Sequence, residues 1–112
     1  MLYSALGFFA LAAVLGMYLL VFILTDKDTP KGVVIIHGFF AVIGITLLII
    51  YPFFNSPSPV TSLVLFILAA LGGLTMIYQD LTGKTFPKWL AVGHGFTAII
   101  AFLLLAVFIF TQ

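Results

Sequence analysis

Four long apolar runs, separated by three short polar connections, make up nearly the whole chain. The runs extend from Leu2 to Leu24, Gly32 to Tyr51, Val60 to Tyr78 and Trp89 to Phe110. A helix of about 20 residues, rising about 1.5 Å per residue, crosses a hydrocarbon layer of about 30 Å. Inside such a layer a segment must satisfy its own backbone hydrogen bonds, so each run predicts a transmembrane helix. Because short connections make consecutive helices antiparallel, we expect an all-α integral membrane protein, an up-down-up-down four-helix transmembrane bundle.

The composition agrees with a surface that faces lipid. Hydrophobic residues make up 64% of the chain and charged residues 6%, and the mean hydropathy is +1.39. A soluble domain carries about 25% charged residues. There is no cysteine, which excludes disulfides and thiolate metal ligands, and there is no basic surface suited to nucleic acid. The expected partner is the lipid bilayer.

The lysines indicate an orientation. All four lie in the first and third connections, which share one side of the predicted bundle: Lys27, Lys31, Lys84 and Lys88. The positive-inside rule places loops 25–31 and 79–88 in the cytoplasm, with both termini outside, and the expected location is a bacterial inner membrane. Thr29 before Pro30 also predicts an N-cap followed by proline in the first helical turn.

The chain aligns with itself when it is shifted by 57 positions, the separation of its two histidines. All four lysines then pair, and so do three motifs: His37-Gly38-Phe39 with His94-Gly95-Phe96, Ala41 with Ala98, and Ala12-Ala13-x-x-Gly16 with Ala69-Ala70-x-x-Gly73. Matches among the rarest residues are harder to explain by composition than matches of leucine. We therefore predict one domain, residues 1–112, made of two repeated helical hairpins (1–56 and 57–112) about a pseudo-twofold axis along the membrane normal.

The repeat places both histidines at the same depth. His37 and His94 each follow a boundary lysine by six positions, or about 9 Å along a helix. The second and fourth helices lie diagonally opposite in the predicted bundle, so both imidazoles can face its axis. Ionisable residues at this depth are candidate functional residues, and neutral imidazole is a common metal ligand. Small residues are expected around the pair: Gly16, Gly73, Gly38, Gly95, Ala41 and Ala98. Lys31 and Lys88 precede the histidines on the cytoplasmic side, and Tyr18, Tyr78 and Thr75 lie near their level.

Paired histidines on helices two and four, with glycines on helices one and three, resemble one half of the transmembrane bundle of the cytochrome b proteins. The resemblance covers the topology of the whole chain. It implies one b-type haem per bundle, with His37 and His94 as its axial metal ligands and the small residues leaving room for the macrocycle. That family tends to use arginine near the propionates; this chain has none, and Lys31 and Lys88 would serve instead. The implied role is one-electron transport with a quinone or an electron-transfer protein, as a carrier rather than an enzyme.

Other functions are compatible with the same residues. In a non-catalytic scaffold or accessory subunit, small residues would allow close helix packing and the histidines would form interhelical hydrogen bonds. A small multidrug transporter needs an intramembrane carboxylate, whereas Asp26, Asp28 and Asp80 lie in or beside the connections. An ion channel lacks a polar lining, and a zinc site needs about four ligands. A homodimer that builds the haem site between two chains is an alternative to the single-chain bundle.

Overall fold

The computed structural model describes all 112 residues and contains four long helices and no strand. The helices are α1 (Leu2–Leu24), α2 (Lys31–Ile50), α3 (Val60–Leu81) and α4 (Lys88–Phe110), and a 3-10 turn, η1 (Tyr51–Phe53), continues α2. Each long helix has the length and apolar composition needed to cross a membrane, which confirms that part of the prediction. The predicted bounds agree closely, although α3 runs past Tyr78 to Leu81.

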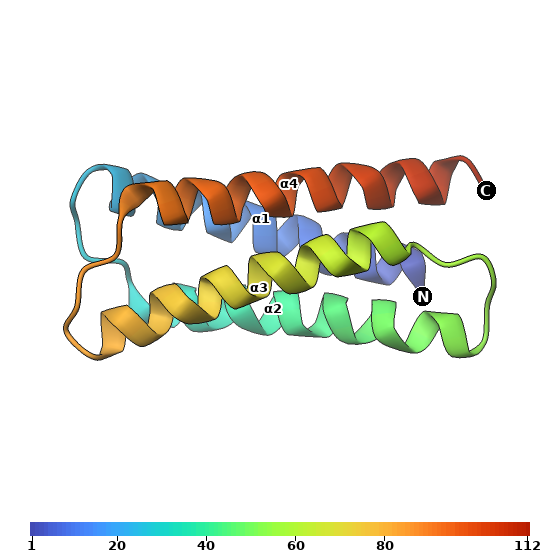
Figure 1. Cartoon of the computed structure of the whole chain (residues 1–112), viewed down its shortest axis with the longest axis horizontal. Coiled ribbons are helices and arrows are strands. Elements are labelled where there is room, and N and C mark those ends of the chain that lie inside the picture. Colours follow the sequence, from blue (N-terminus) through green and yellow to red (C-terminus); the bar gives the residue numbers. More distant parts are fainter.

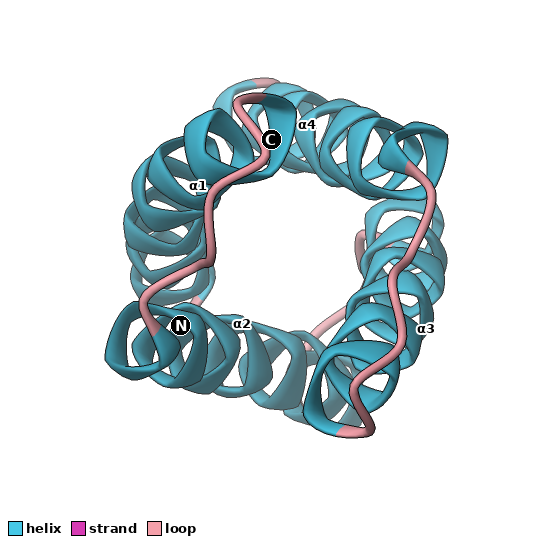
Figure 2. Ribbon diagram, turned by 90° about the vertical axis from the view of Figure 1, so that its left-hand side faces the viewer, coloured by secondary structure: helices cyan, strands magenta, loops and turns pink.

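Neighbouring helices run antiparallel in a bundle about 44 Å long (Figure 1). Along the axis they follow one another around a ring in the order α1, α2, α3, α4, so α2 and α4 lie diagonally opposite (Figure 2). Connections 25–30 and 82–87 share one end, which we call the lysine end. Both termini and connection 51–59 share the other, which we call the terminal end (Figure 1). The α1–α2 and α3–α4 hairpins pack most closely, and the seam between α2 and α3 is the loosest.

At the lysine end, α1 and α3 end in the same way. The hydroxyls of the C-cap residues Thr25 and Thr82 donate to carbonyl oxygens four residues earlier, at 2.7 and 2.8 Å. The next residues, Asp26 and Gly83, have φ of 57° and 75°. Glycine adopts this left-handed conformation freely and aspartate more readily than most residues, so both sequences can reverse direction here. The two turns are 57 positions apart, like the two histidines.

Helices α2 and α4 begin without a side-chain cap. Their N-cap residues are Pro30 and Pro87, both with extended backbones. The prediction of Thr29 as an N-cap is therefore wrong. Helix α2 begins one residue later than that prediction places it, at Lys31, and the Thr29 hydroxyl instead accepts a hydrogen bond from the Lys31 ammonium at 2.9 Å.

A packed core fills the half of the bundle at the terminal end. Phe9 of α1 and Phe66 of α3 stack face to face across the diagonal, with ring centroids 3.6 Å apart. Gly44 of α2 makes room for this pair, since a methyl group there would lie 2.7 Å from the Phe9 ring. Leu48 and Leu105 are the largest fully buried side chains. The complete core cluster is Ala5, Phe9, Leu48, Phe66, Ala101, Leu105 and Ile109.

Candidate functional site: a pair of facing imidazoles

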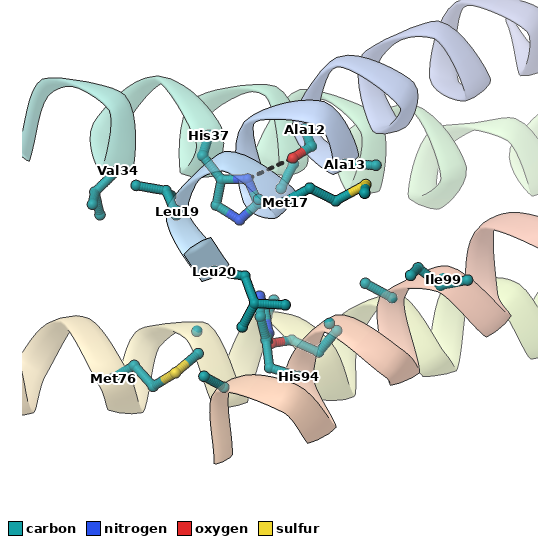
Figure 3. A pocket seen from close by; sticks show the side chains of 18 of the residues that line it. Ala12, Ala13, Met17, Leu19, Leu20, Val34, His37, Met76, His94 and Ile99 are labelled. Carbon is teal, nitrogen blue, oxygen red and sulfur yellow. Dashed lines mark hydrogen bonds between the residues drawn. The ribbon is translucent and has the colours of Figure 1, made fainter. Parts of the chain in front are cut away.

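The two histidines point toward one another across the α2–α4 diagonal (Figure 3). The ring centroids of His37 and His94 are 6.2 Å apart, and the ring planes are inclined by 79°. Each ring also forms a hydrogen bond to the other helix of its own hairpin. Nδ1 of His37 pairs with the Ala12 carbonyl oxygen at 2.7 Å, and Nδ1 of His94 pairs with the Ala69 carbonyl oxygen at 2.6 Å. The site thus consists of two imidazoles, each fixed by one backbone acceptor.

These hydrogen bonds decide which nitrogen carries the proton. A carbonyl oxygen can only accept, so Nδ1 must be the donor in both rings. In a neutral imidazole the other nitrogen, Nε2, then carries an unprotonated lone pair. This arrangement is typical of metal-binding histidines, whose second ring nitrogen donates to a carbonyl or carboxylate. In both histidines Nε2 is therefore the nitrogen left free to accept a hydrogen bond or to act as a ligand.

Glycines on α1 and α3 allow the imidazoles to sit where they do. A methyl group built on Gly16 would lie 3.0 Å from Cε1 of His37, and one built on Gly73 would lie 3.1 Å from Cε1 of His94. Both distances are shorter than ordinary van der Waals contact, so any larger residue would push on the ring. The predicted association of these two glycines with the histidines has a direct steric basis.

A cavity of about 380 Å³ surrounds the histidines and runs from the aromatic stack to the lysine end. Phe9 and Phe66 line it on the side of the packed core, and Thr29, Asp80 and Phe86 line it at the lysine end. Between them the walls are almost entirely apolar. The chain thus leaves a largely apolar space next to the two Nε2 atoms that its own side chains do not fill.

Most of the predicted small residues line the cavity together with the two histidines: Gly16, Gly73, Gly95, Ala41 and Ala98. Gly38 does not line it. Tyr18 and Tyr78 are each more than half exposed and lie outside the lining. The Thr75 hydroxyl donates to the Leu71 carbonyl oxygen of its own helix, at 2.8 Å.

The two lysines form ion pairs at the edge of the site rather than lining the cavity. Lys31 pairs with Asp80, and Lys88 pairs with Asp26 at 3.1 Å. Each pair joins one hairpin to the other. Lys31 therefore bridges α2 and α3, which form the loosest seam, and Lys88 bridges α4 and the turn after α1. Partly exposed pairs of this kind contribute at most about 1 kcal/mol each to stability.

Three features of the site were not predicted from the sequence. The Phe9–Phe66 stack was detectable, because these residues also match under the 57-position shift. The Ala12 and Ala69 acceptors carry no sequence signal, since every residue has a carbonyl. The positions of Met17 and Met76 in the lining depend on how the helices rotate, which apolar periodicity alone does not fix.

The ligand set limits what the site can bind. No group of three or more histidine, cysteine or acidic side chains is close enough to hold a metal ion. A structural zinc site, which needs about four protein ligands, is therefore not formed. No family model, curated protein or solved structure matches this chain.

Proposed function

We propose that this chain is an integral membrane protein that binds one b-type haem between His37 and His94 and carries single electrons. The spacing of the imidazoles carries this proposal. Two metal–imidazole bonds of about 2 Å on opposite sides of one ion place the ring centroids about 6 Å apart. The observed separation is 6.2 Å, with both Nε2 lone pairs available. Two ligands from the protein suffice for haem iron, because the macrocycle supplies the other four.

The cavity supports the same ligand. Its volume of about 380 Å³ lies within the range of small-molecule sites, about 300–1,000 Å³. Gly16 and Gly73 let the two imidazoles pack directly against α1 and α3, with no side chain in between. At the lysine end, Lys31 and Lys88 would offer their charge to the propionates as point charges by exchanging their present partners, Asp80 and Asp26.

The surrounding residues adapt the site to electron transfer. Bound haem supplies a one-electron couple, and two imidazole ligands leave the iron no open position for a substrate. The Ala12 and Ala69 carbonyls accept the Nδ1 protons, which fixes both rings and strengthens Nε2 as a ligand. The walls beside the rings are almost entirely apolar. We infer that the physiological partner is a quinone or an electron-transfer protein.

Exposed apolar side chains and lysine placement support the membrane assignment. Large hydrophobic residues are exposed along all four helices, which suits a surface in contact with lipid rather than water. All four lysines occur at one end. By the positive-inside rule we assign that end to the cytoplasm and both termini to the outside, in a bacterial inner membrane.

Absorption spectra of the detergent-purified protein, oxidised and then reduced with dithionite, test the haem assignment. We expect a sharp Soret band and resolved α and β bands after reduction. His37→Ala and His94→Ala should each abolish these bands. Thr97→Ala is the matched control, since Thr97 lies on the same helix as His94, outside the cavity, and donates to Gly93. A colourless protein that takes up no added haem would refute the proposal.

A non-catalytic scaffold is the second candidate, and the interhelical hydrogen bonds of the histidines favour it. In that case the Nδ1 bonds to Ala12 and Ala69 are the whole role of the imidazoles. Glutamine can donate a hydrogen bond but does not ligate haem iron well. His37→Gln and His94→Gln should therefore preserve a scaffold's assembly, whereas they should remove the haem bands of a cytochrome.

A further inference from the structure

We propose that His37 and His94, in chains that carry no macrocycle, form a two-coordinate site for Cu(I). This inference uses the geometry of the two imidazoles and not the presence of haem, so it can hold or fail separately from the proposed function. The chemical class is a soft monovalent cation held linearly between two nitrogen atoms.

The geometry of the pair meets the requirements of such a site. Linear coordination with bonds of about 2 Å requires ring centroids about 6 Å apart, and those of His37 and His94 are separated by 6.2 Å. The hydrogen bonds of 2.7 and 2.6 Å to backbone carbonyls hold each ring in the tautomer that a metal needs. Gly16 and Gly73 leave room for each ring to take this position against the neighbouring helix. A cation could therefore bind with little rearrangement.

The surroundings select the metal. Zn²⁺ needs about four ligands, and no third histidine, cysteine or carboxylate completes the set. Burying a divalent ion in an apolar cavity without a compensating anion is strongly unfavourable, and a single charge is less so. Asp80, the one carboxylate in the lining, is already paired with Lys31 at the lysine end. The cavity therefore favours a singly charged cation that needs only two neutral ligands.

Two thioethers in the same cavity add to this selectivity. Met17 and Met76 line the space beside the histidines, one on α1 and one on α3 (Figure 3). Thioether and imidazole are ligands that suit copper, and thioether in particular selects its reduced state. The cavity thus offers two imidazole nitrogens, with the thioether of Met76 in its wall and that of the 64% exposed Met17 at its edge. The Ala12 and Ala69 carbonyl oxygens beside the rings already accept the Nδ1 protons.

The test is an anaerobic titration of the haem-free, detergent-purified full chain with Cu(I), in competition with a chromogenic Cu(I) chelator. We expect one Cu(I) per chain, and X-ray absorption should show two nitrogen neighbours. His37→Gln and His94→Gln should each weaken binding at least about 100-fold while keeping the donor to the backbone. Thr97→Ala, outside the cavity, is the control and should leave the affinity unchanged. Met17→Leu with Met76→Leu should weaken binding by less than about tenfold, because the thioethers are secondary to the imidazoles. Protein already loaded with haem should bind no Cu(I).

Several results would overturn the inference. One is a wild-type chain that cannot take Cu(I) from the chelator better than the double glutamine variant. Another is Cu(I) that stays bound in the double glutamine variant but is lost from the variant with Met17→Leu and Met76→Leu. If haem binds and Cu(I) does not, this inference fails and the haem proposal stands. If Cu(I) binds and haem does not, the proposed function fails and the copper site stands.

Discussion

The two halves of this bundle are built from the same four helices but are packed in opposite ways. At the terminal end, stacked aromatic rings and fully buried leucines fill the interior. Toward the lysine end, Leu19 and Ala91 are the only buried residues beyond the level of the histidines, and a cavity takes the place of a core. The two halves of the bundle therefore have different tasks. Dense packing in one half holds the helices together, which leaves the other half free to keep an unfilled space.

The boundary between the halves follows from a change of residue size along α1 and α3. Phe9 is followed by Ala12 and Gly16 on the same side of α1, each about one helical turn further along. Phe66, Ala69 and Gly73 repeat the series on α3. The aromatic pair marks the end of the packed half. The alanines and glycines that follow have a small side chain or none, which leaves room for the imidazoles and the cavity.

The largest expected effect comes from removing core volume at the terminal end. Leu48→Ala or Leu105→Ala should lower the free energy of unfolding by about 2–4 kcal/mol, because each side chain is fully buried and leaves a void. Leu20→Ala is the control at the lysine end, where the side chain already borders the cavity, and it should cost less than about 1 kcal/mol. Reversible unfolding in mixed micelles measures both. Equal losses would show that the two halves are packed alike.

Adding volume to the packed half should be the next most damaging change. Gly44→Ala places a methyl group 2.7 Å from the Phe9 ring and would disturb its stack with Phe66. We expect a loss of about 1–3 kcal/mol in the same unfolding assay. Gly38→Ala has no atom within 4 Å of the new methyl group and should be nearly neutral. A neutral Gly44→Ala would contradict the tight packing described for this half.

In the half at the lysine end, added side-chain volume should affect ligand binding rather than stability. Gly16→Val and Gly73→Val push on the Cε1 side of His37 and His94, where even a methyl group would lie 3.0 and 3.1 Å away. Haem affinity should fall about tenfold, or about 1.4 kcal/mol, with unfolding nearly unchanged. Spectroscopic haem titration is the measurement, with Gly38→Val as control. Loss of stability without loss of haem affinity would reverse the assigned roles of the two halves.

The smallest effects should come from the ion pairs at the lysine end. Asp80→Asn releases Lys31 to face a propionate and should raise haem affinity a few-fold, whereas Lys31→Gln should lower it. Neither change should alter stability by more than about 1 kcal/mol, since the pair is partly exposed. Repeating the titration at high salt should shrink both effects. A decrease in affinity for Asp80→Asn would mean that Lys31 does not serve the ligand.

The sequence predicted the helices well and the details of the site only in part. Apolar runs long enough to span a bilayer leave little freedom, so α1 was predicted from Leu2 to Leu24 as the structure has it. The pairing of His37 with His94 followed from the matched depth of two rare residues. The acceptors at Ala12 and Ala69 could not be predicted, because a backbone carbonyl has no residue type. The partners of Lys31 and Lys88 depend on how the two hairpins meet, and the sequence carries no comparable signal for that.

Electron paramagnetic resonance of the oxidised, haem-loaded protein tests the central claim most directly. Two imidazole ligands make ferric haem low-spin, and ring planes inclined by 79° should give a strongly anisotropic signal dominated by one low-field feature. His37→Gln or His94→Gln should convert it to a high-spin signal or remove it. A wild-type protein that gives a high-spin signal, or the same low-spin signal in either variant, would contradict ligation by this pair of histidines.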